Sequence, residues 1–271
     1  MIHRLDDGIE MYFEINGNTD SKYTLVFLNG LSQSTLSWNF IAPEFYKSLR
    51  VMLIDFVFQG RSGSSNQFRT YDDHAADIFH LISSKFTTGV ILCGISYGSA
   101  VAQHVLVNYP NFFSGAILLS TFAHPTERFN CIGESWKNAL IEGDYPLMLG
   151  VMLPIVLGRD YFENPLIPIS TIREKRLSAH LQKENLLKLM RATEERGDYR
   201  KKLRNIKVPV SVIHGEDDLL ISVDVANEVA NHIPKSTFKV IEKAGHTLNL
   251  EAVPQLIDNI SQFCFQEIFK E

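Results

Sequence analysis

A serine lies between two glycines at residues 94–98, where the chain reads Gly-Ile-Ser-Tyr-Gly. The stretch follows an apolar run typical of a buried strand and leads directly into a helix-forming segment. At so tight a strand-to-helix turn, side chains on the flanking residues would collide, which explains the two glycines. The turn exposes the hydroxyl of Ser96 at the sheet edge, beside the partial positive charge of a helix N-terminus. We therefore interpret Ser96 as a nucleophile; an inert glycine-rich turn is the alternative.

A serine hydroxyl needs a base that takes its proton and a third group that orients the base. Both are expected after later strands, in the order Ser, Asp, His that belongs to this kind of turn. The chain reads Glu-Asp-Asp at 216–218, after one predicted strand, and His246 follows the last predicted strand behind a glycine. The residues thus predict a triad of Ser96, one acid from 216–218, and His246.

Eight other histidines compete with His246 for the role of base. Four lie within helical patterns, where a packed or solvated imidazole is the ordinary outcome: His74, His80, His104 and His232. Four lie elsewhere: His3, His124, His180 and His214. His124 follows a strand end and is a candidate for the wall of a substrate pocket.

Short apolar runs alternate with amphipathic helical patterns, which favours an α/β fold with a mostly parallel sheet and helices on both faces. Asp6-Asp7-Gly8 predicts a hairpin turn between the first two of eight candidate strands. The other six candidates are residues 23–30, 51–57, 89–96, 115–122, 208–215 and 237–245. Helices are predicted at residues 74–86, 97–108, 223–232 and 253–269.

One connection is far longer than the others, since roughly eighty residues separate the sixth and seventh strands, where a crossover normally needs a fraction of that number. It carries helical patterns of its own at 134–142 and 172–195. We therefore predict a helical cap, or lid, over 124–207, inserted into a core made of 1–123 and 208–271.

The predicted cap contains an apolar stretch at 146–157. Methionine lines adaptable apolar pockets, so Met148 and Met152 are candidates for contacts with a substrate. Packing of the cap onto the core is the alternative for this stretch. The charged run 194–204 mixes both signs and is expected to be a solvated helix face.

Composition limits the class of protein. The 271 residues are 45% hydrophobic and carry a formal net charge of −5, so no basic surface for nucleic acid is expected. Three widely spaced cysteines fit no metal pattern and favour a reducing compartment: Cys93, Cys131 and Cys264. No signal peptide and no apolar stretch of the ~20 residues of a membrane span are found. We expect a cytoplasmic protein and leave open whether it forms a homodimer.

The order of these features resembles the α/β-hydrolase superfamily over nearly the whole chain. The segments that carry the resemblance are FLNGLSQSTLSW (27–38), DFVFQGRSGSS (55–65), the serine turn, HGEDD (214–218) and GHTLNLE (245–251). The resemblance implies that Ser96 is the nucleophile, His246 the general base and acid, and Asp218 the orienting carboxylate. It also implies an oxyanion hole formed by the backbone N–H groups of Leu31 and Tyr97.

Two positions depart from the pattern of the superfamily. Most relatives have His-Gly where this chain has Asn29-Gly30, and glycine where it has Phe58. Asn29 can still hydrogen-bond the oxyanion loop, and Asn29 and Ser32 are further pocket candidates. The Asn-Gly start with Asp-x-x-Phe-x-Gly-x-Ser also resembles bacterial acyltransferases that join hydroxyacyl chains into glycolipid precursors.

The sequence therefore predicts a serine hydrolase that cleaves an ester, thioester or related acyl bond in a small, fairly apolar substrate. The triad supplies nucleophile, base and electrophile, so no cofactor and no metal are required. An acyltransferase that uses the same acyl-enzyme is one alternative. A ligand-binding protein without activity is the other, because fold does not fix function.

Overall fold

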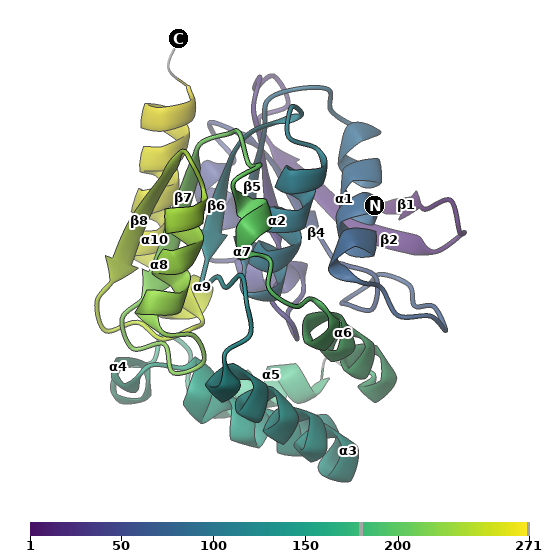
Figure 1. Ribbon diagram of the computed structural model, residues 1–271, viewed down its shortest axis with the longest axis vertical. Coiled ribbons are helices and arrows are strands. Elements are labelled where there is room, and N and C mark those ends of the chain that lie inside the picture. Colours follow the sequence, from purple (N-terminus) through teal and green to yellow (C-terminus); the bar gives the residue numbers. More distant parts are fainter. Residues whose placement is uncertain (179–180, 270–271) are drawn as a thin grey trace.

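The computed structural model describes residues 1–178 and 181–269, and within them the chain forms one eight-stranded sheet (Figure 1). The strands are β1 (Ile2–Arg4), β2 (Glu10–Gly17), β3 (Thr24–Leu28), β4 (Arg50–Ile54), β5 (Val90–Ile95), β6 (Phe113–Leu119), β7 (Val210–Gly215) and β8 (Ser236–Ile241). Their order is β1-β2-β4-β3-β5-β6-β7-β8. Strands β3 to β8 pair in parallel, and β2 is antiparallel to β1 and β4. The predicted mostly parallel sheet of eight strands is confirmed.

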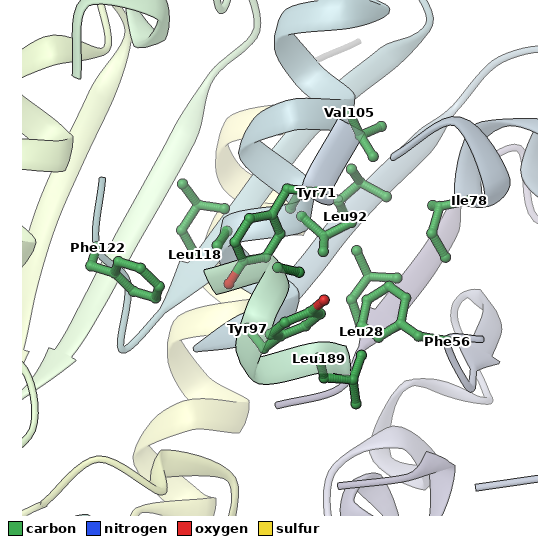
Figure 2. Close-up of a cluster of buried hydrophobic side chains, with 14 of the residues drawn as sticks. Leu28, Phe56, Tyr71, Ile78, Leu92, Tyr97, Val105, Leu118, Phe122 and Leu189 are labelled. Atoms are coloured by element: carbon green, nitrogen blue, oxygen red, sulfur yellow. The ribbon is translucent and has the colours of Figure 1, made fainter. Parts of the chain in front are cut away.

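Helices cover both faces of the sheet, so its central strands are buried on both sides. Helices α1 (Tyr71–Ser83), α2 (Tyr97–Asn108) and α8 (Val223–His232) pack on one face. Helix α10 (Val253–Gln262) and the π-helical turn Phe263–Ile268 pack on the other. Successive residues of a strand point to opposite faces of the sheet. Leu92 packs with Leu28 and Leu118 under α1, α2 and α8 (Figure 2), and the next residue, Cys93, packs on the face covered by α10.

The predicted helices over 97–108 and 223–232 match α2 and α8. Helix α1 begins at Tyr71, earlier than predicted, because the side chain of Thr70 accepts from Asp73 N and the carboxylate of Asp73 accepts from Thr70 N. At the C-terminus, the helix predicted for 253–269 is α-helical as far as Gln262 and continues directly as a π-helical turn over Phe263–Ile268.

Residues 124–207, which we call the insert, connect β6 to β7. They contain α3 (Glu127–Val156), α4 (Arg159–Glu163), α5 (Ile169–Ser178), α6 (Lys183–Glu195) and α7 (Arg200–Leu203). Helices α3 to α6 lie beyond the carboxyl ends of the parallel strands, whereas α7 lies beside α2 and α8 (Figure 1). The predicted helix at 134–142 is part of α3, and the pattern at 172–195 is divided between α5 and α6. His180 lies outside the described residues.

Helix α3 has the length and apolar composition of a membrane-spanning helix. The backbone of Gly143 and Asp144 is not helical, however, so α3 consists of two segments joined at a kink. Each segment is shorter than the ~20 residues that a span requires. Pro146 lies in the first turn of the second segment, where a helix tolerates proline.

The prediction that 194–204 is a solvated helix face is wrong at Arg196. The guanidinium of Arg196 lies among the aromatic rings of Tyr71, Phe122 and Tyr199. Tyr199 belongs to the same run, but Tyr71 and Phe122 come from distant parts of the chain, so the enclosure of Arg196 cannot be predicted from the local pattern of charges.

Candidate active site

Ser96 occupies a strained turn between β5 and α2. Its φ of 52° lies in the left-handed region, which is unfavourable for a residue with a side chain. A Cβ on Gly94 would lie 2.4 Å from Gly98 O, and a Cβ on Gly98 would lie 2.4 Å from Leu28 O. The two glycines therefore let the chain turn sharply against the end of β3 and leave Ser96 at the carboxyl edge of the sheet.

The turn brings Ser96 to His246. The Nε2 atom of His246 lies 2.8 Å from Ser96 Oγ, and its Nδ1 atom lies 2.7 Å from Asp218 Oδ2. A carboxylate can only accept, so Nδ1 carries the proton and Nε2 is free to accept the proton of Ser96. The structure thus connects Ser96, His246 and Asp218 in the order of a nucleophile, a base and an orienting acid.

Asp218 is buried, and its second oxygen is also occupied. Oδ1 accepts hydrogen bonds from Leu220 N and Ile221 N, both at 2.9 Å. Burial by itself raises the pKa of the Asp218 carboxyl, but the interaction with His246 and these hydrogen bonds outweigh it and leave the pKa below its ordinary value. Asp218 is therefore ionised beside His246. The described contacts of Asp217 do not include His246.

His214 is a neighbour of this group that the sequence did not single out. Its Nε2 lies 2.9 Å from Ile221 O and 3.3 Å from Asp218 Oδ2, so this nitrogen carries a proton and faces two acceptors. Burial is the main cause that lowers the pKa of His214 and favours its neutral form. His214 therefore donates to Ile221 O, which holds the loop after β7, and its N–H lies close to the Asp218 carboxylate.

The loop that carries His246 is fixed by a partly buried carboxylate, that of Glu251. Glu251 accepts from Gly158 N at 2.7 Å, and from Gly245 N and Thr247 N, both at 2.9 Å. The backbone N–H of His246 in turn donates to Val156 O at 3.0 Å. Glu251 thus joins the end of α3 to the histidine loop. The motif GHTLNLE contains this glutamate, but nothing in the sequence shows which backbone groups it would meet.

Replacing Glu251 by glutamine is expected to lower kcat about tenfold and to destabilise the fold by about 1–3 kcal/mol, because one amide N–H would be left facing an –NH₂ group. Ester turnover and thermal unfolding of the variant check both effects. The exposed Glu242→Gln is the matched control and should behave as wild type. Equal kcat for both variants would show that Glu251 does not position His246.

The two backbone groups implied for the oxyanion hole lie near Ser96. Leu31 and Tyr97 both line the cavity that contains Ser96 and His246. Tyr97 is the first residue of α2, where the N–H has no partner within the helix. No hydrogen bond from Leu31 N is found among the described residues. Both N–H groups are therefore available to an oxyanion.

The side chain of Asn29 lies in the core next to the oxyanion loop and does not line the cavity. Its side chain is fully buried and donates to Ile54 O at 2.8 Å and to Asp55 Oδ1 at 3.1 Å. Its oxygen accepts from Trp38 Nε1 at 2.9 Å. Asn29 thus hydrogen-bonds the surroundings of the loop as expected, but as a pocket candidate it is misplaced, because every polar atom of its side chain is used inside the core.

Phe58 has a φ of 79°, a left-handed conformation that a glycine adopts without strain. This geometry accounts for the glycine that the superfamily pattern places here. The ring of Phe58 is buried, and the Lys188 ammonium of α6 lies 5.3 Å from its centre. The strain is therefore accompanied by a contact between the core and the insert that a glycine could not make.

A cavity of about 580 Å³ opens beside Ser96 and His246. Most of its large side chains are apolar or aromatic: Tyr71, Phe122, Phe129, Trp136, Met152, Val156, Met190 and Leu220. Its polar side chains include Ser32, Gln33, Asn130, Lys137, Arg176 and Glu194. A size and a lining of this kind suit a small, largely apolar molecule.

The structure brings only some of the pocket candidates to this cavity. Ser32 and Met152 line it. Met148 is fully buried in the core, so packing, the alternative for the apolar stretch, describes this residue. The ring of His124 lies 3.5 Å from Glu228 on α8 and is not among the lining residues.

Replacing Met152 by glutamine is expected to raise KM about fivefold or more for long acyl esters and to change it little for acetyl esters. The reason is that a polar group in the apolar wall weakens burial of acyl CH₂ groups, each of which contributes about 0.8 kcal/mol. Val151→Gln, at the neighbouring and exposed position, is the matched control. Equal changes in KM for both acyl lengths would contradict a contact between Met152 and the acyl chain.

Comparison with known proteins shows the family to which the chain belongs. A family model described as the alpha/beta hydrolase fold matches residues 23–253. The chain is 23% identical over 254 residues to the strigolactone esterase RMS3 of Pisum sativum, with 88% of this chain and 90% of that protein covered. It is also 23% identical over 257 residues to the (R)-3-hydroxydecanoyl-ACP:CoA transacylase of Pseudomonas putida, with 89% and 82% covered.

Among solved structures, the alpha/beta hydrolase enzyme MGS-M2 from a Medee basin deep-sea metagenome library superposes with a TM-score of 0.88. The two chains are 21% identical, and the match covers 100% of this chain and 99% of that one. The chain belongs to the α/β hydrolase fold family. It is an enzyme of the hydrolase type. Within the described residues, no cluster of three or more His, Cys, Asp or Glu side chains could hold a metal ion.

Proposed function

We propose that the protein is a serine hydrolase that cleaves an ester, thioester or related acyl bond in a small, fairly apolar substrate. One observation carries the proposal: an unbroken series of hydrogen bonds from Asp218 through His246 to Ser96, at the wall of a cavity. Nucleophilic catalysis needs this geometry, and an inert glycine-rich turn does not.

In the proposed reaction, Ser96 Oγ attacks the acyl carbonyl while His246 Nε2 takes its proton. Asp218 stabilises the imidazolium that forms, and the N–H groups of Leu31 and Tyr97 bind the oxyanion. His246 then gives the proton to the leaving group, and an acyl-enzyme on Ser96 results. Water attacks the acyl-enzyme with the same base. Each oxyanion donor is expected to contribute about 3–4 kcal/mol.

The substrate class follows from the cavity. Aromatic and apolar side chains from α3 and α6 meet those of the core there, so the acyl part is expected to be apolar. We propose that the insert acts as a cap that excludes water from the acyl group. The relative from Pisum sativum is named an esterase, which supports an ester as the bond that is cleaved.

A second candidate is an acyltransferase that passes the acyl group from Ser96 to an alcohol or thiol. The name of the Pseudomonas putida relative, a transacylase between an acyl carrier protein and coenzyme A, favours it. The apolar cavity suits a fatty hydroxyacyl chain equally well. The two candidates share the acyl-enzyme and differ only in the acceptor.

A screen of p-nitrophenyl esters of graded acyl length, with acyl-CoA thioesters alongside, tests the proposal. A hydrolase releases the free acid at the same rate with and without an added alcohol or thiol. An acyltransferase yields the acylated acceptor in place of the acid. Absence of turnover on every ester and thioester would favour a ligand-binding protein.

We also propose a cytoplasmic setting. The described cysteines Cys93, Cys131 and Cys264 are free, and two of them are buried. Free thiols persist in a reducing compartment.

A further inference from the structure

Arg196 follows the last residue of α6, where the insert returns to the core. The carbon of its guanidinium lies between 4.9 and 5.2 Å from the centres of three rings: Tyr71, Phe122 and Tyr199. Tyr71 and Phe122 also line the cavity. A cation held in such surroundings forgoes much of its hydration, which is costly unless its donors are satisfied.

The hydrogen-bond partners of Arg196 among the described residues are all uncharged. Nη1 donates to Phe122 O at 2.8 Å, Nη2 to Gln103 Oε1 at 2.5 Å, and Nε to His104 Nε2 at 3.2 Å. Because His104 accepts at Nε2, its proton is on Nδ1, which faces Asp72 Oδ1 at 2.8 Å. Burial and the charge of Arg196 lower the pKa of His104 to about 4, so the ring is neutral. The guanidinium charge is therefore not cancelled by its direct partners.

The bond from Arg196 fixes the side chain of Gln103. Since Oε1 of this amide accepts from the guanidinium, Nε2 must point the other way, and it donates to Thr121 Oγ1 at 2.7 Å. Ser99 Oγ lies 2.9 Å from Thr121 Oγ1 and donates to Ser96 O at 2.7 Å. Ser99 has one hydroxyl proton, so the hydroxyl of Thr121 donates to Ser99.

A single direction of donation thus runs from Arg196 through Gln103, Thr121 and Ser99 to the carbonyl of Ser96. Hydrogen bonds in such a chain polarise one another, and a cation at the donor end strengthens each of them. The carbonyl of Ser96 and the N–H of Tyr97 belong to one planar peptide group. This carbonyl also accepts from Ala100 N at 3.0 Å, and the shorter bond from Ser99 is a second constraint on the plane of that peptide. It also polarises the peptide and makes the Tyr97 N–H a better donor.

We propose that Arg196 is a positioning residue for the oxyanion-binding N–H of Tyr97, acting through Gln103, Thr121 and Ser99. The inference rests on the proposed function, because it needs Ser96 as nucleophile. The proposal gives the insert a role in catalysis, because Arg196, the first donor of this series of hydrogen bonds, lies at the end of α6. It requires no contact between Arg196 and the substrate.

The test is the rate at which a p-nitrophenyl alkylphosphonate reacts with Ser96. Reaction at phosphorus develops negative charge on the phosphoryl oxygen, so the rate depends on the oxyanion donors. Arg196→Gln and Thr121→Val should each lower the maximal labelling rate about tenfold, less than the 10²–10³ lost with a whole donor. The phosphonate concentration that gives half of the maximal labelling rate should change by less than about twofold.

The double variant shows whether Arg196 and Thr121 act through one series of hydrogen bonds or through two separate structural effects. If both residues act through one series of bonds, Arg196→Gln with Thr121→Val should be no slower than either single variant. Losses that multiply would overturn the proposal, as would single variants that react like wild type. Arg191→Gln is the matched control, because this α6 arginine pairs with Glu195 at the surface.

Two further readouts keep the test decisive. Should Arg196→Gln fail to fold, Ser99→Ala replaces it, and a maximal rate equal to wild type would overturn the proposal. Failure of the proposed function would look different, since wild type itself would then not be labelled at Ser96.

Discussion

Replacing Ser96 by alanine is expected to lower kcat on a p-nitrophenyl ester by a factor on the order of 10⁶, the loss typical of removing a triad nucleophile. Without the hydroxyl no acyl-enzyme can form, and only binding and the oxyanion donors remain. The fold should be unaffected, because the described contacts of Ser96 Oγ consist of the one with His246. Steady-state kinetics and thermal unfolding of the variant check both statements.

Ser99→Ala is the comparison variant, because it changes a neighbouring hydroxyl and leaves the nucleophile Ser96 in place. The expected loss there is about tenfold, far below that of Ser96→Ala. Turnover by Ser96→Ala at more than a small fraction of the wild-type rate would mean that another group attacks the substrate.

Replacing Asp218 by asparagine is expected to lower kcat by about 10³–10⁴, because an amide can donate to Nδ1 and so favour the wrong tautomer of His246. The free energy of unfolding should fall as well, since Asp218 Oδ1 accepts from two backbone N–H groups and Oδ2 faces two imidazoles. The ratio of kcat between variant and wild type at constant pH measures the effect.

Asp217→Asn is the matched control, because this neighbouring carboxylate makes no described contact with His246. Its kcat should fall less than about tenfold. A larger loss in Asp217→Asn than in Asp218→Asn would place the orienting acid one residue earlier and contradict the geometry of the loop after β7.

Much of the core could be predicted because local patterns determine it. Several of the eight strands, such as β3 and β5, are continuous apolar runs, and the amphipathic pattern of α8 matches its bounds. Ser96 was identifiable because a turn of that geometry excludes side chains on both sides. His246 and an acid within 216–218 could be predicted because parallel strands bring their carboxyl ends to one edge of the sheet. The choice of Asp218 over Asp217 comes from the resemblance to the superfamily.

The parts that depend on contacts between distant segments could not be predicted. Arg196 occurs in a charged run that suggests solvent exposure, and its enclosure depends on the rings of Tyr71 and Phe122, from two distant segments, as well as on the nearby Tyr199. Met148 and Met152 are one helical turn apart and have the same chemistry, yet Met148 faces the core and Met152 the cavity. Residues four apart lie on the same face of a helix, so periodicity alone does not separate the two positions.

The most direct test of the central claim is mass spectrometry of the protein after reaction with a p-nitrophenyl alkylphosphonate. The account predicts one covalent adduct, carried by the peptide that contains Ser96, and no adduct on Ser96→Ala. An unlabelled wild-type protein, or an adduct on any other residue, would contradict the assignment of Ser96 as the nucleophile.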